Sequence, residues 1–230
     1  DTYYRAHRAK GIIVTMACNS PEETCFCSAF GIDAAEASPA SDIVTWDMGD
    51  YILWEAKTEK GEKLTAAVSS VLEDAEDVNA LETLKKEIKE KMESLPLKDL
   101  DPKKITKEQQ ELFDMEDFWG DISKKCLACG SCTFVCPTCH CYDVKDYDGG
   151  NAGERYRCWD SCMISDFTRM AHGNPRTSQL QRVRQRFMHK LVYYPKNHEG
   201  MYSCVGCGRC VEKCPVGLNI VRVIKRLGEE

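Results

Sequence analysis

The sequence contains no apolar run of the roughly eighteen residues that a membrane-spanning helix needs, so we expect no transmembrane segment. An excess of positive charge is also missing, because 31 basic residues stand against 37 acidic ones and the net charge is −6. We therefore expect no nucleic-acid partner, since phosphates attract clustered Lys and Arg. Neither a glycine-rich dinucleotide motif nor a Ser–His–Asp pattern occurs, so the chain is not expected to be catalytic by itself. No secretory segment opens it, and we expect a cytoplasmic protein.

Cysteine, by contrast, is unusually frequent, with 15 residues in a chain of 230. Disulfide frameworks are typical of short secreted chains with an even number of cysteines, and this chain is neither short nor even in count. We therefore expect reduced thiols that bind metal. A repeat contains many of them: residues 126–137 and 204–215 match at six of twelve positions, including all four cysteines and the proline that follows.

Each repeat has the Cys-x2-Cys-x2-Cys-x3-Cys-Pro spacing of bacterial ferredoxins. In that pattern three cysteines bind one [4Fe–4S] cluster and the fourth binds the cluster of the other repeat. Zinc is the alternative, because it also uses four-cysteine sites, but two complete motifs favour the clusters. We expect two [4Fe–4S] clusters, the first bound by Cys126, Cys129, Cys132 and Cys214 and the second by Cys204, Cys207, Cys210 and Cys136.

The remaining sequence predicts an α+β fold in three regions. Residues 1–64 are expected to form a small α+β region, which can be the end of a larger domain, and residues 65–120 a helical connector. In the connector Leu81, Leu84, Ile88 and Met92 share one helix face, and Pro96 ends that helix. Strands are predicted at 11–16 (buried), 42–46 and 51–56, with turns at 47–50 and 60–61.

Residues 121–230 are predicted to form an α-helical ferredoxin-like domain that holds both clusters. The two motifs are separated by the 67 residues between Cys136 and Cys204, which we expect to be mainly helical. Such an arrangement resembles the α-helical ferredoxins found in electron-transfer subunits of larger oxidoreductases. Helices are predicted at 160–171, at 178–194 and after the second motif, where Ile220, Val223, Ile224 and Leu227 share one face.

Longer stretches resemble one family. Residues 126–141, 159–162, 166–171 and 189–214 are similar to the dicluster ferredoxin subunit of sulfhydrogenases, whose family includes the anaerobic sulfite reductase A subunit. The stretches at 25–27 and 48–51 extend the resemblance toward the N-terminus. Family members carry a further N-terminal portion, so the native chain is expected to extend upstream of Asp1.

The resemblance implies an electron relay. Its expected partners are a flavoprotein that binds FAD and NAD(P)H, or a ferredoxin-linked protein, and a catalytic subunit. That catalytic subunit is expected to be a hydrogenase, a sulfite or sulfur reductase, or a heterodisulfide-reductase-like enzyme. Two other functions stay open: a self-contained reductase whose first region holds an organic cofactor, and an iron–sulfur redox sensor.

Seven cysteines lie outside the two motifs: Cys18, Cys25, Cys27, Cys139, Cys141, Cys158 and Cys162. Free cysteine is a common buried residue, but three closely spaced pairs favour a third metal site, which we expect to be iron–sulfur. Cys139, Cys141 and Cys162 are favoured because they lie in the stretches that most resemble the family. Cys25 or Cys27 is expected to supply a fourth ligand, and Cys18 and Cys158 are less favoured.

A basic patch precedes the second motif. It can be a solvated helix face, a docking surface for an acidic partner, or a group of charges that raises a cluster potential. Its members are Arg182, Arg184, Arg186, His189 and Lys190.

Overall fold

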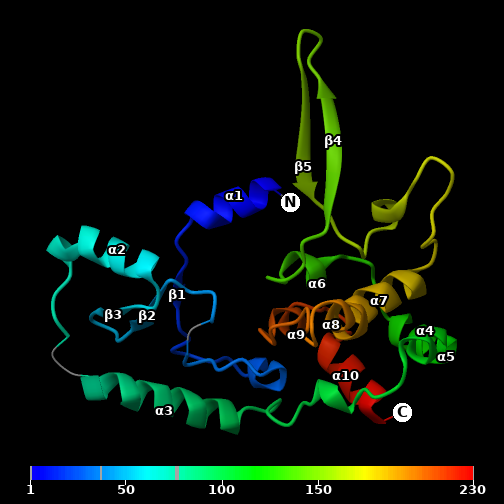
Figure 1. Ribbon diagram of the computed structural model, residues 1–230. Coiled ribbons are helices and arrows are strands. Elements are labelled where there is room, and N and C mark those ends of the chain that lie inside the picture. Colours follow the sequence, from blue (N-terminus) through cyan, green and yellow to red (C-terminus); the bar gives the residue numbers. More distant parts are fainter. Residues whose placement is uncertain (1, 37, 76–77, 230) are drawn as a thin grey trace. The chain divides into compact units, whose positions relative to one another are not determined.

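The computed structural model describes residues 2–36, 38–75 and 78–229, which form two compact units, 1–98 and 99–230 (Figure 1). Both units contain helices and strands, which confirms the α+β class. The expected domains 1–64, 65–120 and 121–230 stay a prediction. The two compact units divide between Lys98 and Asp99. In the part of the chain that is described, none of the helices has the length and apolar character needed to cross a membrane.

The first unit contains a three-stranded sheet in the order β1-β2-β3, with β1 (Val14–Met16) parallel to β2 (Ile43–Asp47). The expected hairpin is confirmed, because β2 pairs antiparallel with β3 (Ile52–Ala56) around a tight turn. The prediction of a buried first strand is wrong: Val14 and Met16 are 48% and 57% exposed. β1 is an edge strand, so a neighbouring strand of the sheet, β2, flanks it on one side only and its side chains are more accessible to solvent.

The longest helix of this unit, α3 (Val78–Ser94), confirms the helix predicted from apolar spacing. Ile88 and Met92 are buried against Ala35, and the helix ends before Pro96. The predicted turn at 60–61 is wrong, because both residues lie inside α2 (Glu59–Ala67). The other helical segments are α1 (Thr2–Lys10), η1 (Cys27–Phe30) and η2 (Ser69–Val71).

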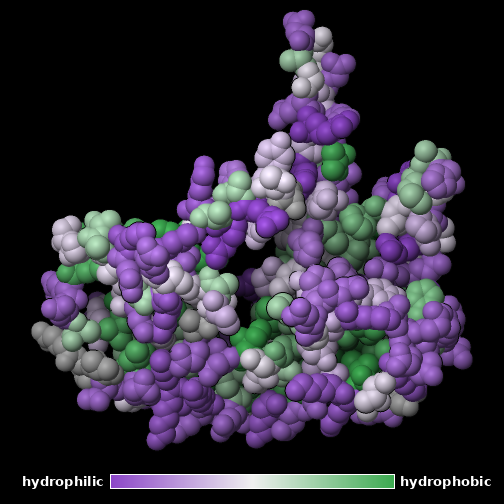
Figure 2. Space-filling view, in the orientation of Figure 1, coloured by the Kyte–Doolittle hydropathy of each residue, from purple (hydrophilic) through white to green (hydrophobic). Residues whose placement is uncertain are grey.

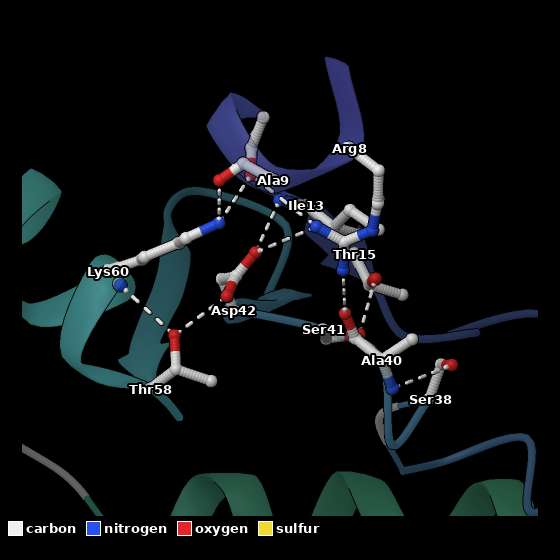
Figure 3. Close-up of polar contacts among 12 residues, drawn as sticks. Arg8, Ala9, Ile13, Thr15, Ser38, Ala40, Ser41, Asp42, Thr58 and Lys60 are labelled. Atoms are coloured by element: carbon white, nitrogen blue, oxygen red, sulfur yellow. Dashed lines mark hydrogen bonds and ion pairs between the residues drawn. The ribbon is translucent and has the colours of Figure 1, made fainter. Parts of the chain in front are cut away.

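A buried carboxylate joins the segments of the first unit (Figure 3). Asp42 accepts hydrogen bonds from the Ile13 amide at 2.9 Å and from the Thr58 hydroxyl at 2.7 Å, and Arg8 lies 3.9 Å away. The Ile13 and Thr58 hydrogen bonds hold the pKa of Asp42 below its ordinary value of 3.8. Because Thr58 is the N-cap of α2, the carboxylate connects that helix to β1 and β2.

The second unit contains most of the remaining helices. α7 (Gln179–Met188) packs on α5 (Glu116–Ser123) and continues through a π-helical turn, η5 (His189–Tyr193), into α8 (Tyr194–Asn197). The predicted helix at 178–194 is thus confirmed, with Ser178 as its N-cap. α10 (Ile220–Glu229) buries the predicted apolar face against η3 (Pro102–Lys104). The short helices are α4 (Gln109–Asp114), α6 (Ser131–Phe134), η4 (Ser165–Thr168) and α9 (Arg209–Glu212).

A β-hairpin replaces much of the helix expected between the cysteine motifs. β4 (Tyr142–Asp148) pairs antiparallel with β5 (Gly153–Trp159), and both strands project from the helices of their unit (Figure 1). The predicted helix at 160–171 is wrong: only the single 3₁₀ turn η4 forms there. Gly150 has a φ of +83° and lies in the turn between β4 and β5. Glycine adopts this left-handed conformation easily, and the prediction of a mainly helical segment did not take it into account.

Candidate metal centres

The two cysteine motifs fold into loops with the same backbone conformation. Ala128 and Gly130 have φ of +56° and +73°, and the equivalent Gly206 and Gly208 have φ of +63° and +71°. These left-handed residues curl each loop before the short helix that follows it, α6 or α9. The two helices contact each other. The sequence repeat is therefore also a structural repeat, built where alanine and glycine accept positive φ.

The four cysteines expected to bind the first cluster line one cavity, and Cys214 comes from the second motif. Burial raises the pKa of Cys132, as do the negative charges of Cys126 and Cys214. Exposed Cys129 behaves differently, because hydrogen bonds from the Ser131 hydroxyl and amide lower its pKa. Several thiols that raise one another's pKa are suited to bind iron, which replaces their protons.

The second set brings Cys136 to the cysteines of the other motif. Burial raises the pKa of Cys204 to about 11, and the Gly206 amide opposes this by hydrogen bonding to the sulfur. Negative charge on Cys136 and Cys210 raises the pKa of Cys204 and of Cys207. Negative charge on Cys136 thus acts on two cysteines of the second motif, as expected for a crossed arrangement.

Polar side chains beside the thiols were not expected from the sequence. The Gln179 amide donates to Cys126 Sγ at 3.2 Å from the start of α7, and Thr138 Oγ1 lies 3.3 Å from Cys136 Sγ. Hydrogen bonds of this kind stabilise charge on sulfur. Nothing near Gln179 in the sequence indicates this role, because its partner lies 53 residues away.

The basic patch is largely buried, so its interpretation as a solvated face or docking surface is wrong for four of its members. Arg186 and Lys190 are only 2% and 3% exposed, and Arg182 and Arg184 are also buried. Arg186 donates from Nη2 to the Cys132 carbonyl at 3.0 Å, whereas its Nε and Nη1 have no hydrogen-bond partner in the described part of the chain. Lys190 donates from Nζ to the Ser203 carbonyl at 2.7 Å.

Two of these buried cations, Arg186 and Lys190, lie near cysteines. Burial by itself lowers the pKa of Arg186, but negative charge on nearby thiolates outweighs it and leaves the pKa raised. Cys132 and Cys210 are the thiols that contribute most. A guanidinium without water needs anionic partners, and thiolates or a bound cluster supply them. The donor set and the unpartnered guanidinium nitrogens therefore fit anionic iron–sulfur clusters.

The seven other cysteines separate into groups. Cys18, Cys25 and Cys27 are neighbours in the first unit, where burial and then the charge on Cys25 raise the pKa of Cys27. Cys158 lies on β5, with its Sγ 4.0 Å from the Asp143 carbonyl. The predicted contribution of Cys25 or Cys27 to the third site stays a prediction. The remaining three, Cys139, Cys141 and Cys162, line a second cavity of the other unit.

Within the described ranges, no three His, Cys, Asp or Glu side chains converge closely enough to hold one metal ion. The ligands of a cubane bind four separate irons and stand further apart than those of a single ion.

Comparisons with known proteins agree with the cysteine motifs. A family model for the 4Fe-4S dicluster domain matches residues 125–218. The chain is also 33% identical over 233 residues to sulfhydrogenase 2 subunit beta of Pyrococcus furiosus. That alignment covers 100% of this chain and 66% of the relative, so the chain spans about two thirds of the relative's length. No solved structure matches the chain. The resemblance expected from the sequence is thereby confirmed.

Proposed function

The chain belongs to the family of 4Fe–4S dicluster electron-transfer subunits that includes sulfhydrogenase 2 subunit beta, and from this membership we propose that it relays electrons within a multisubunit oxidoreductase. The observation that supports the proposal is the position of two cysteines: Cys214 lines the cavity of the first motif, and negative charge on Cys136 acts on Cys204 of the second. These positions support two [4Fe–4S] clusters held close together. The proposed sets are Cys126, Cys129, Cys132 and Cys214, and Cys204, Cys207, Cys210 and Cys136.

When bound, each cluster accepts and releases one electron. The chain's own residues set the conditions for this. Amide hydrogen bonds to sulfur, such as that from Gly206 to Cys204, offset the negative charge of the reduced state. Arg186 adds a full positive charge in a site from which water is excluded, and there it acts more strongly than on the surface. Both effects favour reduction of the neighbouring cluster.

The proposed partners follow from this one-electron chemistry. Hydride from NAD(P)H carries two electrons, and a flavin is the group that separates them. We therefore place FAD on a partner flavoprotein, and substrate reduction on a catalytic hydrogenase or reductase subunit, in a cytoplasmic complex. A ferredoxin-linked donor would serve the same end, because it delivers single electrons.

The hairpin of β4 and β5 supports a role as a subunit. A two-stranded hairpin is at best marginally stable in water without further packing. Tyr147 and Trp159 are 63% and 53% exposed on it, although its far end is mostly hydrophilic (Figure 2). We propose that a partner subunit of the complex covers this hairpin.

Anaerobic purification tests the proposed function. We expect about eight irons per chain from the two motifs, with matching acid-labile sulfide. The isolated chain should accept electrons from dithionite, yet neither oxidise NAD(P)H nor reduce sulfite. Stoichiometric zinc with little sulfide would contradict the cluster assignment. NADH-driven turnover by the isolated, flavin-free chain would contradict the relay, and bound flavin would favour a self-contained reductase.

A further inference from the structure

The base of the β4–β5 hairpin brings together three cysteines that neither motif uses. Cys141 immediately precedes β4, and Cys162 follows β5 by a few residues. The hairpin holds both ends in register, because Tyr142 pairs with Trp159 and the Asp160 amide donates to the Cys141 carbonyl at 3.0 Å. Cys139 reaches the same place from the end of the first motif. Residues that are distant in sequence are thus placed at one site by strand pairing.

The three thiols line one cavity of about 390 Å³. Cys141 and Cys162 lie close enough for their side chains to interact. Cys139 lies near enough for its charge to act on Cys162, and it also interacts with Cys136. Cys158, although on the same hairpin, is not among the residues that line this cavity.

Two buried cations line this cavity, which suits an anionic occupant. Arg186 and Lys190 line it and are 2% and 3% exposed. The Nε and Nη1 nitrogens of Arg186 have no partner among the described residues. Leaving a buried guanidinium with unpaired donors is strongly unfavourable, so a bound anionic group is expected to accept from them. Arg186 also lines the cavity of the first motif, and therefore lies between the two sites.

We infer that this cavity holds a third iron–sulfur cluster whose ligands include Cys139, Cys141 and Cys162, with Arg186 as the buried cation between it and the first cluster. The inference extends the proposed relay and rests on it. Each thiol loses its proton when it binds iron, and an iron–sulfur bond replaces the sulfur–hydrogen bond. Soft thiolate donors favour an iron–sulfur cluster over oxygen-preferring metals. A third cluster at this place would lead from the motifs toward the hairpin.

The experiment compares the whole chain with Cys141→Ser, Cys162→Ser and the matched control Cys158→Ser, all prepared anaerobically. We expect about twelve irons in the unmodified chain and in Cys158→Ser, and about eight in the other two variants. Electron paramagnetic resonance of the reduced proteins should show one cluster signal fewer in those two variants. The signals of the two motif clusters should remain, which shows that the unit is folded.

The iron content of the unmodified chain tests the third cluster even where a variant fails to fold. Eight irons there would overturn the third cluster and leave the proposed relay intact, whereas far fewer than eight would contradict the relay itself. Eight irons with one zinc per chain would overturn the iron–sulfur assignment of this site. Equal iron content in Cys158→Ser and Cys141→Ser would likewise overturn it.

Discussion

The guanidinium of Arg186 donates a hydrogen bond to the backbone carbonyl of Cys132, 54 residues earlier in the chain, at 3.0 Å. The contact joins α7 to the first cysteine loop and holds a positive charge at the metal centre. Because Arg186 is buried, little water screens that charge. A side chain that was one of several basic residues in the sequence is therefore part of the proposed electron path.

Replacing Arg186 with Gln is expected to lower the reduction potential of the nearest cluster. One charge within several ångströms at an effective dielectric of about 20 contributes roughly 2 kcal/mol, or about 100 mV. The reduction potential shifts to a more negative value because the reduced cluster loses the cation that stabilises it. A potentiometric titration followed by electron paramagnetic resonance measures the shift. Arg186→Lys should retain most of the potential, and exposed Arg155→Gln should change nothing; an unaltered potential in Arg186→Gln would contradict the role.

Replacing Cys136 with Ser should damage the cluster held by Cys204, Cys207 and Cys210, although Cys136 belongs to the first motif. The expectation follows from the charge interactions of Cys136 with Cys204 and Cys207. Spectroscopy on protein with resolved cluster signals measures which one is lost. The reciprocal variant, Cys214→Ser, should damage the other cluster. Loss of the cluster nearest in sequence in both variants would show that each motif is self-contained.

Gly61→Ala should destabilise the first unit even though alanine is the better helix former by about 1 kcal/mol. A Cβ at Gly61 meets the Asp42 carbonyl oxygen, which is backbone and cannot move aside. Overpacking of this kind costs about 1–3 kcal/mol. Chemical denaturation followed by circular dichroism measures the change. Gly120→Ala, also in a helix but with only Leu180 nearby at 3.8 Å, is the control and should be neutral or stabilising.

Asp42→Asn should weaken the first unit near neutral pH. A pKa held below 3.8 means that the folded state favours the carboxylate. Its contribution to stability is therefore present above that pH and is lost as the pH falls through the folded-state value. The difference in unfolding free energy between the native chain and Asp42→Asn should shrink in acid, as measured by denaturation across the pH range. Asp50→Asn, in the exposed turn, serves as the control; a difference independent of pH would refute the assignment.

Shortening the hairpin should separate partner binding from cluster binding. If residues 145–156 are replaced by a short turn, the cysteines at the hairpin's base remain and the iron content should be unchanged. Copurification with the other subunits should be lost or strongly reduced, because the proposed contact surface is gone. The control is reversal of the exposed ion pair between Asp146 and Arg155, which keeps the hairpin and should keep the complex. Undiminished copurification of the shortened chain would disprove the contact.

Local patterns in the sequence were sufficient for several features of this protein. The cysteine spacing alone predicts the metal chemistry, because a loop of eleven residues contains the ligands and the positive-φ positions at Ala128 and Gly130 that it needs. The hairpin of β2 and β3 and the helix α3 were also predicted, since a short turn and a helical repeat depend only on residues close in sequence.

Only the tertiary structure decided the rest. The burial of Arg186 depends on how α7 lies against the cysteine loops, and a charged side chain is normally assigned to the surface. The convergence of Cys141 and Cys162 depends on the pairing of β4 with β5, which the sequence did not predict because polar residues occupy both strands. These two contacts join segments that are distant in sequence. They depend on packing and strand register, so a local pattern of residues does not predict them.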